Sequence, residues 1–326
     1  MRAALCKTFG GPEVVTVEEI DPPVPGPGEV LLDVRSCALN FFDTLAIRDK
    51  YQYKPTLPFS PGGEVCATVA AAGPGVTGVE AGVRVIAYLG ARFNGCREQT
   101  LADADSLIPV PDAVPDAVAC GVIVTYGTAI HGLKDRGRLQ PGQTLAVLGA
   151  AGGAGLAAVE IGKRLGARVI ACASSPEKLA LCREHGADET INYASEDLKQ
   201  RLRDLTGGAG ADVIYDCVGG DYAEPAFRSI AWEGRYLVIG FAAGGIPRMP
   251  LNLALLKGAD IAGVFWGEWA KRNPERQRAN IAQVLDWCAS GELKPHVHKV
   301  YPLEEIVEAL KVLDTRRAKG KVVIAP

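Results

Sequence analysis

Residues 148–179 read "LGAAGGAGLAAVEIGKRLGARVIACASSPEKL". The apolar run "TLAVLG" at 144–149 leads into this stretch, a glycine-rich turn follows, and the next residues repeat with a helical period. A second apolar run, "ARVIACA" at 167–173, comes after the helix. Strand, glycine turn, helix and strand in this order are typical of a βαβ unit that binds a dinucleotide.

The helix expected at 153–165 has two distinct faces. A surface helix that lies on a sheet carries apolar residues at intervals of three to four positions and polar residues opposite them. Here the apolar face carries Ala154, Ala158, Ile161 and Leu165, and the face expected to point to solvent carries Glu160, Lys163 and Arg164.

The same alternation continues along the chain. Strands alternating with helices of ten or more residues indicate a doubly wound parallel sheet, so we expect a Rossmann domain over residues 125–262. The expected elements are "ETINY" at 189–193, a helix at 196–205, "DVIYDCVG" at 212–219, a helix at 222–232 and "RYLVIGF" at 235–241.

Residues 1–124 follow a different pattern. Short β-branched runs such as "EVLLDVRSCAL" (29–39) and "EVCATVAAAG" (64–73) are separated by turns rich in proline and glycine, as in a compact β-rich domain. Residues 263–326 return to mixed strands and helices, and we expect them to complete this first domain. The fold class is therefore α/β, with a β-rich domain beside a Rossmann domain.

The glycine turn fits the G-x-G-x-x-G fingerprint with one departure. Its three positions are Ala150, Gly152 and Gly155, with Gly153 and Ala154 between them. Gly152 would let the backbone approach a pyrophosphate at the helix N-terminus, and Gly155 would let helix and strand pack closely. The alternative is a tight turn in some other βαβ protein. Alanine at the first position requires a backbone conformation that is open to residues other than glycine.

The end of the second strand indicates which dinucleotide is bound. NAD-specific sites place an acid there for the ribose 2′-hydroxyl, but this chain has Ala173, Ser174 and Ser175, followed by Lys178. Two hydroxyls and an ammonium favour a 2′-phosphate, so the sequence predicts NADP(H). The alternative is that the serines only cap the next helix and the lysine is solvated.

Composition and charge indicate which kinds of partner and which cell compartment to expect. The chain has 326 residues, 22% charged and 48% hydrophobic, with a net charge of −3 and no long basic run, which argues against nucleic acid as a partner. No apolar segment reaches the length of a membrane span, and the N-terminus lacks the apolar core of a signal peptide. Nine scattered cysteines fit reduced thiols, so we expect a cytoplasmic protein.

Several separated motifs give the chain a family resemblance over its whole length. They are "CALNFFD", "LPFSPGGEV", "VTYGTAIHGL", "GAAGGAGLAAVE", "ADETINY", "YDCVGG" and "RRAKGKVVI". The sequence resembles the zinc-free quinone oxidoreductases, the ζ-crystallin-like group of medium-chain dehydrogenases/reductases. The resemblance implies a GroES-like N-terminal domain, a Rossmann domain and a homodimer.

The resemblance also bears on metal binding. Zinc alcohol dehydrogenases of the same fold hold their metal with a Cys, a His and a Cys, and these positions align with Asn40, Gly63 and Cys120. One thiolate cannot build a three-ligand zinc site, so we expect no catalytic metal. The remaining chemistry is hydride delivery from NADPH to a quinone or an α,β-unsaturated carbonyl.

Matching motif to motif assigns roles to residues. Asn40 resembles the family asparagine beside the nicotinamide ribose and substrate, and Asp43 is expected to be structural. Tyr51, with Tyr53 beside it, lies where the family places a tyrosine at the cleft mouth; either donates a proton or simply packs. The remaining cofactor contacts implied by the resemblance are Thr125, Tyr193, Cys217, Gly240, Phe241, Val264, Phe265 and Arg316, with Lys178 and Arg316 supplying charge to the 2′-phosphate.

Two alternatives to a quinone or enone reductase remain open. One is a 2-enoyl thioester (acryloyl-CoA-like) reductase, which would need basic groups for the coenzyme A phosphates. The other is a non-catalytic NADPH- or RNA-binding member of the same group.

Overall fold

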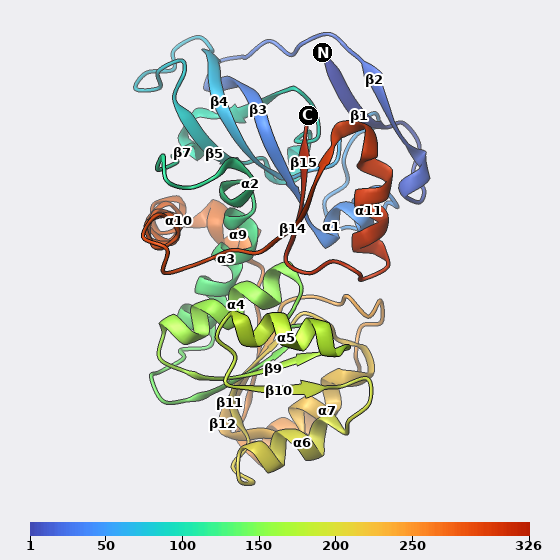
Figure 1. The fold of residues 1–326 in the computed structure, drawn as a ribbon, viewed down its shortest axis with the longest axis vertical. Helices are drawn as coiled ribbons and strands as arrows, with labels where there is room; N and C mark the ends of the chain where they lie inside the picture. Colours follow the sequence, from blue (N-terminus) through green and yellow to red (C-terminus); the bar gives the residue numbers. More distant parts are fainter. The chain divides into compact units, whose positions relative to one another are not determined.

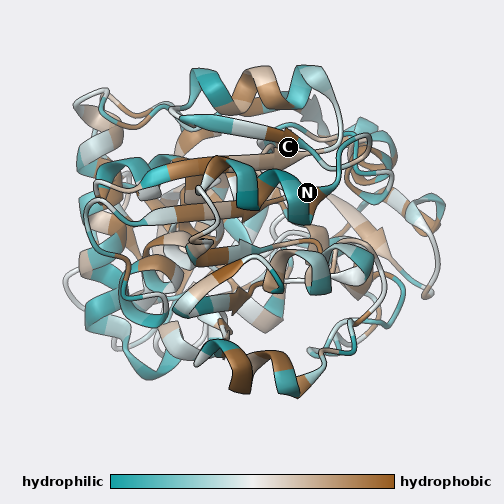
Figure 2. Cartoon of the chain, turned by 90° about the horizontal axis from the view of Figure 1, so that it is seen from below, coloured by the Kyte–Doolittle hydropathy of each residue, from teal (hydrophilic) through white to brown (hydrophobic).

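The computed structural model describes all of residues 1–326. The chain divides into two compact units, one formed by Met1–Val124 with Lys271–Pro326 and the other by Thr125–Ala270. In Figure 1 the first unit has the two ends of the colour scale, blue to cyan and red, and the second has the middle. Figure 2 shows hydrophobic stretches along the strands and hydrophilic stretches on outer helix turns.

The first unit is built on a seven-stranded sheet of order β14-β15-β3-β4-β5-β7, with β6 paired to β3, and a separate β1-β2 hairpin. Val323 pairs with Ala38 and Cys37 with Val65, so the C-terminal segment belongs to the same sheet as the N-terminal one. The strands are β1 (Arg2–Cys6), β2 (Val15–Glu19), β3 (Glu29–Leu39), β4 (Glu64–Ala72), β5 (Arg84–Tyr88), β6 (Gln99–Asp103), β7 (Ile108–Pro109), β14 (Val297–Pro302) and β15 (Lys321–Ala325).

One core fills this unit. Leu32 and Leu39 of β3, Val65 of β4 and Ile324 of β15 are at most 1% exposed and join a cluster that includes Leu310. β3 buries alternate residues near its start, and β3, β4 and β15 bury consecutive apolar residues where they lie inside the unit, which explains why these apolar runs form a sheet. The helical segments are η1 (Pro12–Val14), α1 (Phe41–Ala46), η2 (Gly90–Arg92), η3 (Ala104–Ser106), α2 (Asp116–Ala119), α10 (Pro274–Ala289), η6 (Leu303–Glu305) and α11 (Ile306–Asp314), and α3 (Val122–Ile130) crosses into the second unit.

The second unit is a six-stranded sheet of order β10-β9-β8-β11-β12-β13 in which every pair is parallel. The doubly wound α/β architecture expected from the sequence is thereby confirmed. Its elements are η4 (His131–Arg136), β8 (Thr144–Leu148), α4 (Gly153–Arg164), β9 (Arg168–Ala173), α5 (Pro176–Glu184), β10 (Glu189–Asn192), α6 (Leu198–Leu205), β11 (Ala211–Asp216), η5 (Gly220–Tyr222), α7 (Ala223–Phe227), β12 (Ile230–Val238), α8 (Leu251–Lys257), β13 (Asp260–Gly263) and α9 (Trp266–Arg272).

Several features differ from the sequence expectation in this unit, among them the strand expected at 235–241, which is β12 and runs from Ile230 to Val238. The helix expected at 222–232 ends at Phe227, because Ile230 and Ala231 are buried and begin β12. Glu160, expected to face solvent, is only 7% exposed and accepts a hydrogen bond from the Tyr126 hydroxyl. Its other carboxylate oxygen lies 2.9 Å from His185 Nδ1, so buried polar partners hold this side chain inside.

The boundary expected at residue 263 also differs. The structure keeps 263–270 in the second unit. Trp266 packs so closely on Gly127 that a Cβ there would lie 2.8 Å from the indole ring. Trp269 stacks on His131 with ring centroids 4.1 Å apart, so these aromatic contacts explain the assignment. No helix combines the length and the apolar character needed to cross a membrane.

Candidate functional site

The glycine turn lies between β8 and α4, as the sequence predicts. The positive φ of +72° falls on Gly149, one residue before Ala150, so Ala150 itself needs no glycine-only conformation. Gly152 is the N-cap of α4, with extended backbone. A Cβ at Gly155 would lie 2.2 Å from the carbonyl oxygen of Gly149, so this position requires glycine. The amides at the start of α4 leave a site suited to an anion.

The end of β9 presents hydroxyls and an ammonium. β9 ends at Ala173, and Ser174 is exposed next to it. Lys178 Nζ donates to Ser174 Oγ at 3.4 Å. Ser175 Oγ accepts from the Lys178 amide at 3.4 Å and so caps α5. The capping role therefore accounts for Ser175 and leaves Ser174 and the Lys178 ammonium together at the strand end.

Tyr193 lies beside the same strand end. Its amide donates to the Ala173 carbonyl oxygen at 3.1 Å, and its ring lies 4.4 Å from that of Tyr222. Burial raises the pKa of the Tyr193 phenol to about 12. The phenol is therefore neutral at ordinary pH, and a neutral hydroxyl beside Ser174 is compatible with a phosphate ligand.

The turns after β8, β11 and β12 also meet. A Cβ at Gly149 would lie 3.5 Å from Cys217 Cβ, and a Cβ at Gly240 would lie 3.6 Å from the Cys217 carbonyl oxygen. Burial raises the pKa of the Cys217 thiol, so it stays protonated. The structure thus brings Cys217 and Gly240 to the glycine turn, at the carboxyl edge of the sheet where such folds bind ligands.

The other predicted contacts of the second unit are placed as follows. Val264 follows β13 and its amide donates to Val238 O at 3.0 Å, while Phe265 is about half-exposed. Phe241 lies 2.9 Å from the position of a Cβ on Gly219. Thr125 is buried in α3, at the start of this unit. Arg316 belongs to the first unit, just after α11.

In the first unit, Asn40 is the N-cap of α1. The backbone N–H of Asn40 donates to Asp43 Oδ2 at 2.7 Å, and the backbone N–H of Gly62 donates to Asp43 Oδ1 at 2.8 Å. Burial raises the pKa of the Asp43 carboxyl to about 7, against the opposing effect of these two backbone donors. Asp43 thus joins two loops of backbone, which agrees with the structural role expected for it.

The Asn40 side chain is part of a buried charged cluster. Lys321 Nζ donates to Asn40 Oδ1 at 2.7 Å, to Glu64 Oε1 at 2.8 Å and to Leu39 O at 3.1 Å. Asn40 Nδ2 donates to Glu64 Oε1 at 2.9 Å, and the Val124 amide donates to Glu64 Oε2 at 2.8 Å. The amide of Asn40 is therefore fixed in orientation by two oppositely charged neighbours.

Sequence reasoning missed Glu64 and Lys321. Each begins a strand that is otherwise apolar, "EVCATVAAA" and "KVVIA". A single charge at the start of such a run was the available signal, since buried charges are nearly always paired.

The two tyrosines lie in an aromatic cluster after α1. Tyr51 stacks on Phe42 at 5.3 Å, and Tyr53 meets Tyr51 edge-on at 5.8 Å. Burial raises the pKa of the Tyr51 phenol to about 12, so the proton that a donor would need stays on the oxygen.

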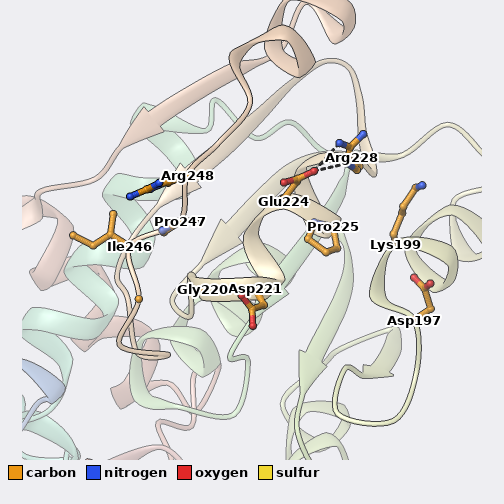
Figure 3. Close-up of a pocket in the computed structure, with 11 residues that line it drawn as sticks. Asp197, Lys199, Gly220, Asp221, Glu224, Pro225, Arg228, Ile246, Pro247 and Arg248 are labelled. Atoms are coloured by element: carbon orange, nitrogen blue, oxygen red, sulfur yellow. Dashed lines mark hydrogen bonds and ion pairs between the residues drawn. The ribbon is translucent and has the colours of Figure 1, made fainter.

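A cavity in the second unit contains none of the predicted residues. Its volume is about 640 Å³, and Figure 3 shows acidic and basic side chains mixed around it. Arg228 pairs with Glu224 at 2.6 Å across its rim. Because its lining is mixed in charge and includes no residue of the glycine turn or of the end of β9, its size alone does not make it the cofactor site. The lining residues are Asp197, Lys199, Gly220, Asp221, Glu224, Pro225, Arg228, Gly245, Ile246, Pro247 and Arg248.

Comparison with known proteins agrees with this architecture. Residues 26–130 match the alcohol dehydrogenase GroES-like domain, and residues 153–290 match the family model described as zinc-binding dehydrogenase. The bovine quinone oxidoreductase-like protein 2 is 39% identical over 325 residues, covering 99% of this chain and 92% of the relative. The Pseudomonas aeruginosa quinone oxidoreductase is 33% identical, covering 98% and 97%.

The chain belongs to the quinone oxidoreductase family of medium-chain dehydrogenases/reductases. Among solved members, the Pseudomonas syringae quinone oxidoreductase has a TM-score of 0.93 at 30% identity, covering 100% of this chain and 99% of that one. The Escherichia coli quinone oxidoreductase, solved in complex with NADPH, has a TM-score of 0.94 at 26% identity and full coverage of both chains.

The residues of this family member do not fit the catalytic zinc of the alcohol dehydrogenases. The Asn40 side chain is hydrogen-bonded to Lys321 and Glu64. Gly63 has no side chain that could bind a metal. Burial raises the pKa of the Cys120 thiol. A thiol that resists ionisation is a poor zinc ligand, and it would be alone. No group of three His, Cys, Asp or Glu side chains lies close enough together to hold a metal ion.

Proposed function

We propose that this chain is an NADPH-dependent reductase that transfers a hydride to a quinone or an α,β-unsaturated carbonyl without a metal. The bound nicotinamide would supply the hydride. Such acceptors are already electrophilic and need positioning more than Lewis acid activation. The names and NADPH complexes of the relatives support the reaction class and the cofactor.

The observation that carries the cofactor assignment is the end of β9. Ser174 and the Lys178 ammonium lie within 3.4 Å of each other, next to a strand that ends in Ala173. A phosphate with nearly two negative charges is bound by such donors and repelled by the acid that an NAD site would hold.

The residues of this chain would bind the cofactor, orient the reactants and donate the proton. The amides at Gly152 and Gly153 would bind the pyrophosphate, and Cys217, Gly240 and Phe241 would lie along the nicotinamide end. Asn40, held by Lys321 and Glu64, would orient the reacting partners, and Tyr51 or Tyr53 would donate the proton. Ala150, Ala154, Gly155, Thr125, Ser175, Tyr193, Val264, Phe265 and Arg316 complete the proposed cofactor contacts.

We also propose a homodimer that acts in the cytoplasm. Leu251 and Leu255 of α8 are 76% and 81% exposed, and β13 is an outer strand of the parallel sheet, with Ile261 exposed on it. Exposed apolar residues beside an open sheet edge are typical of a subunit interface. The nine cysteines are all free thiols, which agrees with a reducing compartment.

The test is turnover with NADPH and NADH in parallel, on an ortho-quinone and on an alkyl enone. The proposal predicts reduction of at least one acceptor, with NADPH preferred in kcat/KM. No turnover of either acceptor by protein that binds NADPH tightly would contradict the reductase. Equal kcat/KM for the two cofactors would contradict the assignment of the 2′-phosphate site.

A further inference from the structure

A second cavity lies in the first unit, outside every residue proposed above. Its volume is about 360 Å³, within the range of small-molecule pockets. The lining comes from the chain after Tyr53, from η2 and the loop that follows it, and from β6. The lining residues are Lys54, Pro55, Thr56, Pro58, Phe59, Ala91, Arg92, Phe93, Asn94, Arg97 and Leu101.

The charge of this lining is one-sided. Lys54, Arg92 and Arg97 are basic, and no Asp or Glu lines the cavity. Two of the three cations already have carboxylate partners outside the lining. Lys54 pairs with Asp49 at 2.7 Å, and Arg92 pairs with Glu29 at 2.6 Å and Asp103 at 2.8 Å.

Arg97 is the cation without a carboxylate. Its Nε donates to the Asn94 carbonyl oxygen at 2.9 Å and one terminal nitrogen donates to Thr100 Oγ1 at 3.3 Å. Both acceptors are neutral, and the second terminal nitrogen has no protein partner. The guanidinium is therefore held in place by neutral groups while part of its donor fork remains open.

Burial makes this arrangement costly in the absence of an anion. Desolvation alone lowers the pKa of Arg97 to about 10, and no acid opposes it. An anionic ligand is expected to stabilise a guanidinium that is partly buried, held in place and not paired with a carboxylate. The reason is that a charge-assisted hydrogen bond is stronger in such surroundings than in water.

Apart from Thr56 and Asn94, the rest of the lining is apolar. Phe59 and Phe93 are 2% and 1% exposed, and Pro55 is buried as well. Their rings meet at 5.4 Å and form a fixed wall. Pro58 and Leu101 extend the apolar surface. An ion without an apolar body, such as phosphate, would leave the accessible apolar surface of Pro58, Ala91 and Leu101 uncovered.

We propose that this cavity is a binding site for an organic carboxylate with an apolar body, held through Arg97. The carboxylate accepts hydrogen bonds from the open guanidinium fork, and the hydrocarbon covers the accessible surface of Pro58, Ala91 and Leu101. The ring of Phe93 also lies 6.1 Å from that of Phe42, which stacks on Tyr51, so the buried floor of the cavity is continuous with the aromatic cluster that holds the proposed proton donor.

The test is calorimetric titration of the full chain with hexanoate, hexan-1-ol and inorganic phosphate. Hexanoate is expected to bind, and hexan-1-ol and phosphate to bind at least about tenfold more weakly, because each lacks half of the recognised chemistry. Absence of hexanoate binding, or phosphate binding as tight as that of hexanoate, would overturn the proposal.

Variants locate the site. Arg97→Gln should weaken hexanoate binding at least about tenfold, whereas the matched control Arg201→Gln, which breaks a half-buried pair with Glu196 in the other unit, should not. If Arg97→Gln does not fold, Ala91→Trp, at an exposed lining position, fills the cavity instead and should abolish binding. Hexanoate affinity unchanged in either folded variant would also overturn the proposal.

Discussion

The ammonium of Lys321 lies 2.8 Å from the carboxylate of Glu64, and these side chains are 5% and 0% exposed. The two residues are 257 positions apart, so this ion pair joins the last strand of the chain to β4. Both groups also contact the Asn40 amide. The ion pair therefore both joins the C-terminal strand to the sheet of the first unit and orients the side chain of Asn40, a proposed catalytic residue.

Removing one charge of this pair should be costly. Lys321→Met is expected to lower the free energy of unfolding by about 3–5 kcal/mol, since it leaves the Glu64 carboxylate buried without its counter-ion. Urea unfolding measures the change. The matched control is Lys299→Met, which breaks the exposed pair with Glu305 and should change stability by less than about 1 kcal/mol.

The double variant Lys321→Met/Glu64→Gln separates pairing from packing. It removes both charges and should be more stable than Lys321→Met alone. An equal effect of Lys321→Met and Lys299→Met would show that the buried pair is not the stabilising contact described here.

Two glycines of the same turn should respond differently to alanine. Gly155→Ala should lower the free energy of unfolding by about 1–3 kcal/mol, because its methyl would lie 2.2 Å from the Gly149 carbonyl oxygen. In Gly152→Ala the added methyl would lie 3.5 Å from the same oxygen, which is an ordinary van der Waals contact. This variant should therefore have the free energy of unfolding of the wild-type protein. It should instead weaken NADPH at least about tenfold, as measured by titration, because the methyl occupies the approach to the pyrophosphate. Similar melting temperatures for the two variants would contradict this division.

The phosphate assignment is tested at the end of β9. Lys178→Ala should raise the Kd of NADPH by about 10- to 100-fold, because a charge-assisted hydrogen bond to the 2′-phosphate is lost. The Kd of NADH should stay nearly unchanged. Ser174→Asp places a carboxylate at an exposed position and should reverse the preference toward NADH. Fluorescence titration of both cofactors measures the two constants. Equal weakening of NADPH and NADH by Lys178→Ala would mean that the ammonium contacts something other than the 2′-phosphate.

The proposed dimer predicts a specific loss of association. Leu255→Glu puts a charge on the exposed apolar face of α8 and should convert the dimer to a monomer in light scattering coupled to size exclusion. The control is Val24→Glu, an equally exposed apolar residue of the first unit, which should stay dimeric. A wild-type chain that is monomeric at all accessible concentrations would rule out the dimer.

Local patterns predicted the Rossmann elements because strand, turn and helix signals there are short-range. The run at 29–39 was predicted with the same ends as β3, and the helix after the glycine turn with a difference of one residue. The helix expected at 222–232 was too long, because Ile230 and Ala231 are as compatible with a helix as with a strand. Only their burial in β12 decides between the two.

Partners distant in sequence were beyond the reach of local patterns. Glu160 has the spacing of a solvent-facing residue on α4, yet Tyr126 and His185 from other segments bury it. Lys321 and Glu64 each look like a strand-end charge until the sheet brings them together. The position of Ala150 shows the opposite case: an apparent departure from the glycine fingerprint is harmless, since Gly149 takes the left-handed conformation.

Reduction of a quinone or an enone by NADPH without a metal is tested by following NADPH oxidation by absorbance, with an ortho-quinone and with an alkyl enone as acceptor. The assay is run before and after exhaustive dialysis against a chelator. The zinc content of the same samples is measured. We predict turnover that survives dialysis at an unchanged rate in protein containing far less than one zinc per chain. Turnover that is lost on dialysis and restored by zinc would contradict this prediction, and so would the absence of turnover with both acceptors.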